Sequence, residues 1–204
     1  MSLTTPKAAF QLLKRHVARM NKWFIVPHAG SLKLGSNEQL DLDAYVVLCH
    51  AELEYYFEEL AKWLLDTMVH RWRMQSKASG GLVALALRYN ATAVDWSVES
   101  THFERVRTFL EDKAKKDHSH LIDNNHGTGL DYLLKMLAPL GIDIPRDANW
   151  RNSLDILVRV RGERAHKGRL GATILKSPTD LSIIVADCVK LAEKVRDLVL
   201  AVAN

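Results

Sequence analysis

Hydrophobic residues recur along most of the chain at every third or fourth position, which is the spacing of one face of an amphipathic helix. The clearest stripe begins at Leu42 and continues through Tyr45, Val46, Cys49, Leu53, Tyr56, Phe57, Leu60 and Leu64. It predicts one long helix from about Glu38 to Gln75. The β-like stretches, such as residues 23–27, are isolated and bounded by turn residues. The pattern therefore predicts an all-α fold, a helical bundle.

Weaker stripes predict the rest of this bundle. Gly80 and Gly81 indicate a break after the long helix, and helical spacing resumes over residues 93–116. We expect a loop at residues 117–129, because this segment is rich in turn-forming residues. A short helix is expected at about residues 130–139.

The last two predicted helices have recognisable ends. Asp147 or Asn149 can cap the first of them. Gly168 and Gly171 are suited to end it, since glycine readily adopts the left-handed conformation found just past a helix. Ser177, followed by a proline, is a good start for the second.

Length and composition are those of one globular domain. The chain has 204 residues, 48% of them hydrophobic and 25% charged, enough for one substantial core. We expect residues 1–37 to form an N-terminal helix and a connecting segment packed on the bundle, and residues 38–204 to form the bundle. Cys49 and Cys188 lie on apolar helix faces, which favours reduced thiols in a cytoplasmic protein. No apolar run is long enough to span a membrane, and no membrane partner is expected.

Positive charge gathers in one part of the chain. The net charge of +4 is too small by itself to indicate a nucleic-acid-binding protein. Residues 151–170 have as large an excess, because six Lys and Arg residues stand there against Asp155 and Glu163. In this segment Arg161 and His166 are separated by four residues. On a helix these two positions point roughly 140° apart.

The basic segment has two interpretations. In the first it is a solvated helix end, where the cations offset the negative end of the helix dipole and Arg159 pairs with Glu163. In the second it is an active site, because histidine exchanges protons near neutral pH and a guanidinium can hold two phosphoryl oxygens. The residues alone leave both interpretations open.

Two long segments carry a family resemblance. Residues 124–168, which end in RGERAHKG, resemble the C-terminal half of HEPN-superfamily domains, especially the subgroup associated with ribosomal L-PSP proteins. Residues 44–61, AYVVLCHAELEYYFEELA, resemble the first long helix of that subgroup. RGERAH resembles the signature of the superfamily, an arginine and a histidine with four to six residues between them. The resemblance implies a dimeric helical bundle of the HEPN type.

Many HEPN proteins are metal-independent endoribonucleases, so the resemblance also implies an activity. Arg161 would stabilise the scissile phosphate and His166 would act as acid or base, leaving a 2′,3′-cyclic phosphate. The residues expected to bind the substrate beside them are Arg159, Arg164, Lys167 and Arg169. No metal or cofactor is expected. The implied partners are RNA, a second copy of the chain, and an antitoxin or defence-system protein, since such proteins are frequent in toxin-antitoxin and antiphage systems.

The chain departs from the superfamily pattern at two positions. Gly162 follows the arginine, where many members have a polar residue, which leaves catalysis open. The tyrosine that follows the histidine in nucleotidyltransferase-paired members is absent, which argues against control by tyrosine modification. The alternative is a non-catalytic HEPN-like module that binds nucleic acid or a protein.

Supporting residues can be named on two elements. His50 and Glu54 are four residues apart beside the apolar stripe of the long helix, so they can orient a catalytic group or form a simple surface pair. Glu163 lies between the two catalytic candidates and is a third supporting candidate.

A third interpretation is a metal-dependent hydrolase. His118, His120 and His126, with Asp123, are the most metal-like cluster in the sequence. However, no cysteine is near them and their segment is rich in turn formers. In the family that the chain resembles, residues 124–127 fit better as a structural turn.

Overall fold

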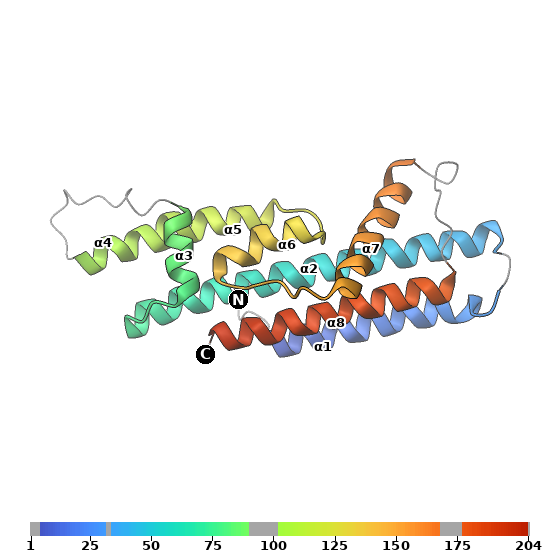
Figure 1. The fold of residues 1–204 in the computed structure, drawn as a ribbon, viewed down its shortest axis with the longest axis horizontal. Coiled ribbons are helices and arrows are strands. Elements are labelled where there is room, and N and C mark those ends of the chain that lie inside the picture. Colours follow the sequence, from blue (N-terminus) through green and yellow to red (C-terminus); the bar gives the residue numbers. More distant parts are fainter. Residues whose placement is uncertain (1–4, 32–33, 90–101, 168–176, 204) are drawn as a thin grey trace.

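The computed structural model describes residues 5–31, 34–89, 102–167 and 177–203. Every regular element in these ranges is helical, which confirms the all-α prediction. Figure 1 shows an elongated bundle in which most helices run along one long axis.

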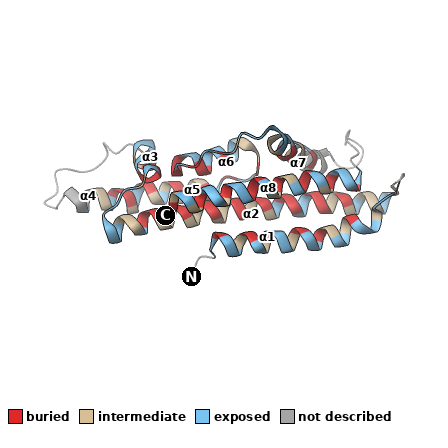
Figure 2. Ribbon diagram, turned by 60° about the horizontal axis from the view of Figure 1, so that its bottom comes forward, coloured by how far each residue is buried: buried red, intermediate tan, exposed pale blue. Residues whose placement is uncertain are grey.

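One long helix, α2 (Ser36–Gln75), forms the centre of the bundle. It covers the predicted helix at residues 38–75, and the predicted apolar stripe is its buried face. α1 (Pro6–Met20) and α8 (Pro178–Ala203) pack along it and against each other. In Figure 2 the buried positions of these helices face one another, so the core lies along the length of α2.

The C-terminal half of α2 is also covered by a second run of helices. α4 (His102–Thr108) and α5 (Lys116–Asp123) are joined by a π-helical segment and form one continuous run. The predicted loop at residues 117–129 is therefore wrong over its first half. Although most residues of this segment are polar, it forms a helix with a buried face that contains His118 and Ile122.

The glycine pair after α2 begins a helix. The break lies at residues 76–79, and α3 (Gly80–Arg88) starts directly after it. The Ser79 hydroxyl caps α3 by accepting from the backbone N–H of Leu82 at 3.1 Å. A Cβ on Gly81 would overlap the carbonyl oxygen of Leu140, so only glycine allows this close approach.

The remaining helices agree with the predictions. α6 (Leu130–Leu137) continues into a single 3-10 turn. α7 (Ala148–Lys167) starts after Asp147, whose carboxylate accepts from two backbone N–H groups of the first turn at 2.9 and 3.1 Å. At the start of α8, the Ser177 hydroxyl accepts from the N–H of Asp180 at 3.1 Å. Both predicted caps are confirmed.

The two cysteines belong to the core. Cys49 and Cys188 are buried and free, and burial raises the pKa of each thiol to about 12. Both are therefore protonated near neutral pH and act as packing groups.

Residues 21–28 form short π-helical and 3-10 turns (Asn21–Ile25, Val26–His28). None of the described helices combines the length and the apolar character needed to cross a membrane.

Candidate functional site

The basic segment lies on α7, which crosses the central helix. α7 packs against α2 and α8, and it buries three apolar residues: Leu154, Leu157 and Val160. Figure 1 shows its last turns projecting beyond the bundle. Arg161 directly follows Val160 and is half-buried, whereas Arg159 is exposed. Among the described cations of this segment, Arg151 and Arg161 are thus half-buried at the edge of the core.

The second member of the predicted pair, His166, lies on the same uninterrupted helix. Because α7 is α-helical as far as Lys167, positions 161 and 166 diverge by roughly 140° around its axis. Glu163 is half-buried between them. The predicted site residues whose side chains lie outside the described part of the chain are Arg164, His166, Lys167 and Arg169. Gly168 and Gly171, the predicted end of the helix, also lie outside it.

His50 on α2 lies close enough to Arg161 for the two to interact. Its residue surface is 3% exposed. Burial, together with the positive charge of Arg161, lowers the pKa of His50 to about 4. At neutral pH this imidazole is therefore uncharged, which avoids repulsion between it and the nearby guanidinium. The structure brings together Arg161 and His50, two residues that lie more than one hundred positions apart in the sequence.

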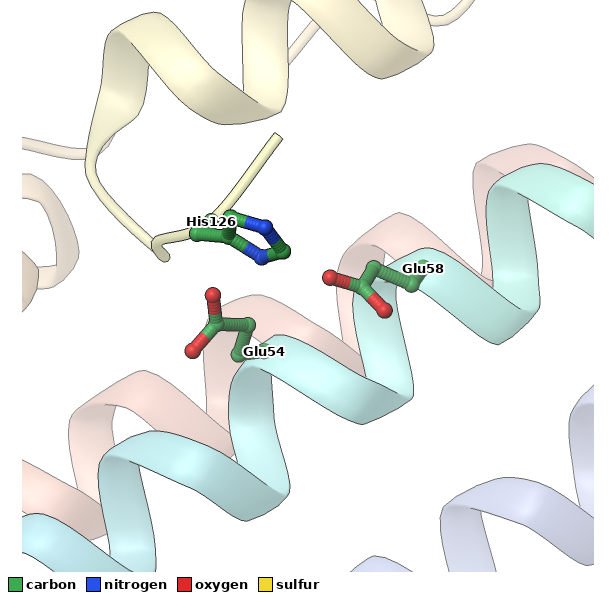
Figure 3. A group of neighbouring side chains, drawn as sticks. All are labelled: Glu54, Glu58 and His126. Carbon is green, nitrogen blue, oxygen red and sulfur yellow. The ribbon is translucent and has the colours of Figure 1, made fainter. Parts of the chain in front are cut away.

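Glu54 connects His50 to a second polar cluster. His50 Nδ1 lies 3.6 Å from Glu54 Oε2, within ion-pair distance but beyond a hydrogen bond. One turn further along α2, Glu58 faces the same way, and both carboxylates point toward His126 from the loop between α5 and α6 (Figure 3). One ligand atom from each of Glu54, Glu58 and His126 lies within 4.8 Å of the others.

The loop that presents His126 is held by its neighbours. Asn125 is buried, and its side-chain amide donates to the carbonyl oxygen of Tyr132 at 3.1 Å. Gly127 has a φ of +146°, which L side chains rarely adopt, and a Cβ there would press on the Tyr132 ring at 3.0 Å. His126 itself is exposed. The buried Asn125 thus anchors the loop next to this histidine, while the His126 imidazole is accessible.

The histidine cluster predicted from the sequence does not form. His118 is fully buried, and its two ring nitrogens contact the Met136 carbonyl oxygen at 2.9 Å and the Tyr89 hydroxyl at 3.1 Å. His120 lies next to Asn124 on the exposed side of α5. Among the described residues, the group with metal-ligand spacing contains His126 but neither of these two histidines. The metal-dependent site centred on all three is therefore wrong.

Sequence reasoning missed Glu58 and the partners of His126. A signal for Glu58 exists, because His50, Glu54 and Glu58 are spaced by four residues and such residues share one helix face. The approach of His126 to that face depends on the loop conformation, for which the sequence holds no comparable pattern.

The arrangement offers two kinds of chemistry. Among the described side chains, no carboxylate forms an ion pair with Arg161, so its guanidinium is available for a phosphate. The neutral His50 beside it can hold a hydrogen-bond partner without adding positive charge. The carboxylates of Glu54 and Glu58 offer oxygen ligands or proton acceptors on the same face of α2.

Fold and site together define an all-α bundle with a polar site where a crossing helix meets the long central helix. The family model described as RiboL-PSP-HEPN matches residues 28–201. The chain therefore belongs to the RiboL-PSP-HEPN family, which confirms the resemblance found in its sequence. No curated protein and no solved structure gave a significant match.

Proposed function

We propose that this protein is a metal-independent endoribonuclease that acts as a homodimer. The observation that carries the proposal is the position of Arg161, a half-buried arginine without a carboxylate partner among the described side chains. Arg161 lies on the helix in which the resemblance predicts the arginine and histidine pair. A guanidinium in such a position stays charged at any relevant pH and can bind a phosphate through two N–H groups. In a cell, such an activity would make the protein a toxin or antiphage effector under the control of a partner protein.

The chemistry follows from the residue types. A His166 imidazole takes the proton of the RNA 2′-hydroxyl, and the 2′-oxygen bonds to the adjacent phosphorus while the bond from phosphorus to the 5′-oxygen breaks. The leaving oxygen receives a proton from a second, protonated imidazole. Arg161 offsets the charge that develops on the phosphoryl oxygens. The products are a 2′,3′-cyclic phosphate and a 5′-hydroxyl.

A homodimer supplies what one chain lacks. The mechanism needs two imidazoles near one phosphate, and a two-fold axis brings the same helix from two copies together. The first half of α2 exposes four apolar side chains, each more than 40% exposed: Leu40, Val47, Leu48 and Tyr55. Exposed apolar side chains grouped in this way are typical of a protein interface. This face supports association of two copies near α7.

The test is cleavage of mixed cellular RNA by the purified protein in EDTA. The wild type is compared with Arg161→Ala and His166→Ala, and the product ends are analysed. Each substitution is expected to reduce the cleavage rate at least ~100-fold, the usual effect of losing a charge-stabilising or proton-transferring group. Arg146→Ala and His120→Ala are matched controls, because both side chains are exposed and lie outside the site.

The outcomes separate the two functions in the family. Cleavage by the wild type and the controls alone, with cyclic phosphate ends, supports the ribonuclease. A folded wild type that binds RNA or a partner protein without cleaving RNA is the non-catalytic module instead. Equal cleavage by the wild type and both site variants would show that the activity does not arise from this site.

A further inference from the structure

The cluster of Glu54, Glu58 and His126 is separate from the arginine and histidine pair of the proposed ribonuclease. Its side chains come from two elements: the carboxylates lie one turn apart on α2, and the imidazole comes from the loop after α5 (Figure 3). From this convergence we propose that Glu54, Glu58 and His126 bind one divalent transition-metal ion, which ties the loop between α5 and α6 to the central helix.

The geometry suits a metal ion. Carboxylate oxygens and imidazole nitrogens bind zinc-like ions at ~2.0–2.2 Å, so ligand atoms around one ion lie roughly 3–4 Å apart. The ligand atoms of the three side chains already lie within 4.8 Å of one another. Side-chain rotations that move each atom by less than about 1 Å close the remaining gap.

The loop presents its histidine in a fixed position. Asn125, the residue before His126, is buried. Its side-chain amide donates a hydrogen bond to the Tyr132 carbonyl oxygen at 3.1 Å, which anchors this side of the loop. Gly127, the residue after His126, has a φ of +146°, a conformation that favours glycine. His126 therefore needs little backbone ordering to bind an ion, and this lowers the entropic cost of binding.

The charges at the cluster also favour a cation. Glu54 and Glu58 place two carboxylates one turn apart on the same face of α2. Lys62 forms its ion pair with Asp123, at 2.8 Å. Among the described residues, no Lys or Arg side chain forms an ion pair with Glu54 or Glu58. A bound cation would offset the repulsion between these two carboxylates.

The ligand types select the ion. An imidazole favours transition metals such as Mn²⁺ and Zn²⁺ over Mg²⁺ and Ca²⁺, which prefer oxygen ligands alone. In any one site Zn²⁺ binds more tightly than Mn²⁺. His50, whose Nδ1 lies 3.6 Å from Glu54 Oε2, would help to orient that ligand. The ion holds the loop in place and takes no part in the proposed RNA cleavage.

The experiment titrates the purified full chain with Mn²⁺, after treatment with a chelator and its removal, and follows free Mn²⁺ by electron paramagnetic resonance. We expect one Mn²⁺ per chain, displaced by equimolar Zn²⁺ but not by equimolar Mg²⁺. Glu58→Gln and His126→Ala should each weaken binding at least tenfold. Glu59→Gln is the matched control, because Glu59 is the next carboxylate on the same helix and lies outside the cluster. It should bind Mn²⁺ as the wild type does.

Two results would overturn the proposal: a wild type that leaves the free Mn²⁺ signal unchanged, or variants that bind as tightly as the wild type. Thermal melting by circular dichroism shows that each variant is folded, and Glu58→Gln preserves the size of the side chain. The readout needs no RNA, so it is independent of the ribonuclease. A chain that cleaves RNA in EDTA but binds no Mn²⁺ supports the ribonuclease and overturns the metal site. A chain that binds Mn²⁺ but does not cleave RNA supports the metal site and overturns the ribonuclease.

Discussion

The buried His50 makes stability depend on pH in a way that can be calculated. Its pKa is about 4 in the folded chain against 6.5 when unperturbed. The unfolded chain therefore binds a proton more readily, so the stabilising contribution is fully present above pH 6.5 and is lost as the pH falls toward 4. Relative to pH 7, the loss is about 2 kcal/mol at pH 5 and about 3 kcal/mol at pH 4.

This loss is measured by comparing urea unfolding of the wild type and His50→Gln from pH 7 to pH 4. Glutamine does not titrate, so the variant should lose about 2–3 kcal/mol less than the wild type over this range. Other groups, such as the buried His118, titrate in both proteins and cancel. In Arg161→Gln the pKa of His50 should rise, because a positive neighbour is gone. The same pH dependence in wild type and His50→Gln would refute the assignment.

Further predictions concern three glycines and a helix cap. Gly81→Ala should lower the free energy of unfolding by about 1–3 kcal/mol, because its Cβ would overlap the Leu140 carbonyl, whereas Gly80→Ala, with nothing within 4 Å, should not destabilise the chain in urea. Gly162→Ala also meets nothing within 4 Å, so urea unfolding should show a gain of about 0.5–1 kcal/mol, while RNA cleavage should fall at least tenfold if a phosphate approaches beside Arg161. Ser177→Ala should lower stability by about 1 kcal/mol in thermal melts, because the Asp180 N–H loses its acceptor.

The parts of the fold that the sequence predicts well are those with a long stripe or a marked end. The start of α2 was predicted within two residues, and the start of α8 follows from the serine and proline before it. The helix through residues 117–123 was missed because its buried positions include a histidine. The hydrogen bonds that make His118 tolerable in the core come from Met136 and Tyr89, which are distant in the sequence.

In the candidate site, too, local patterns are predictable from the sequence, whereas contacts between distant segments are not. The sequence predicts Arg161 and the pair of His50 and Glu54 as candidates, because a basic segment and a four-residue spacing are local patterns. Their proximity to one another was not predicted, since it results from α7 crossing α2. His126 was assigned to the wrong neighbours, because nearness in sequence to His118 and His120 is a poor guide when one lies inside the bundle and another on an exposed helix face.

The course of α7 also decides how two copies must share the work. Arg161 lies close enough to His50 on α2 for its charge to lower the pKa of that imidazole, and the position five residues later lies roughly 140° around the helix from Arg161. One copy therefore presents its arginine and its histidine positions on different sides of one helix. A phosphate held by Arg161 of one copy is reached most directly by the corresponding helix of a second copy. The proposed mechanism thus requires the dimer for its geometry as well as for its second imidazole.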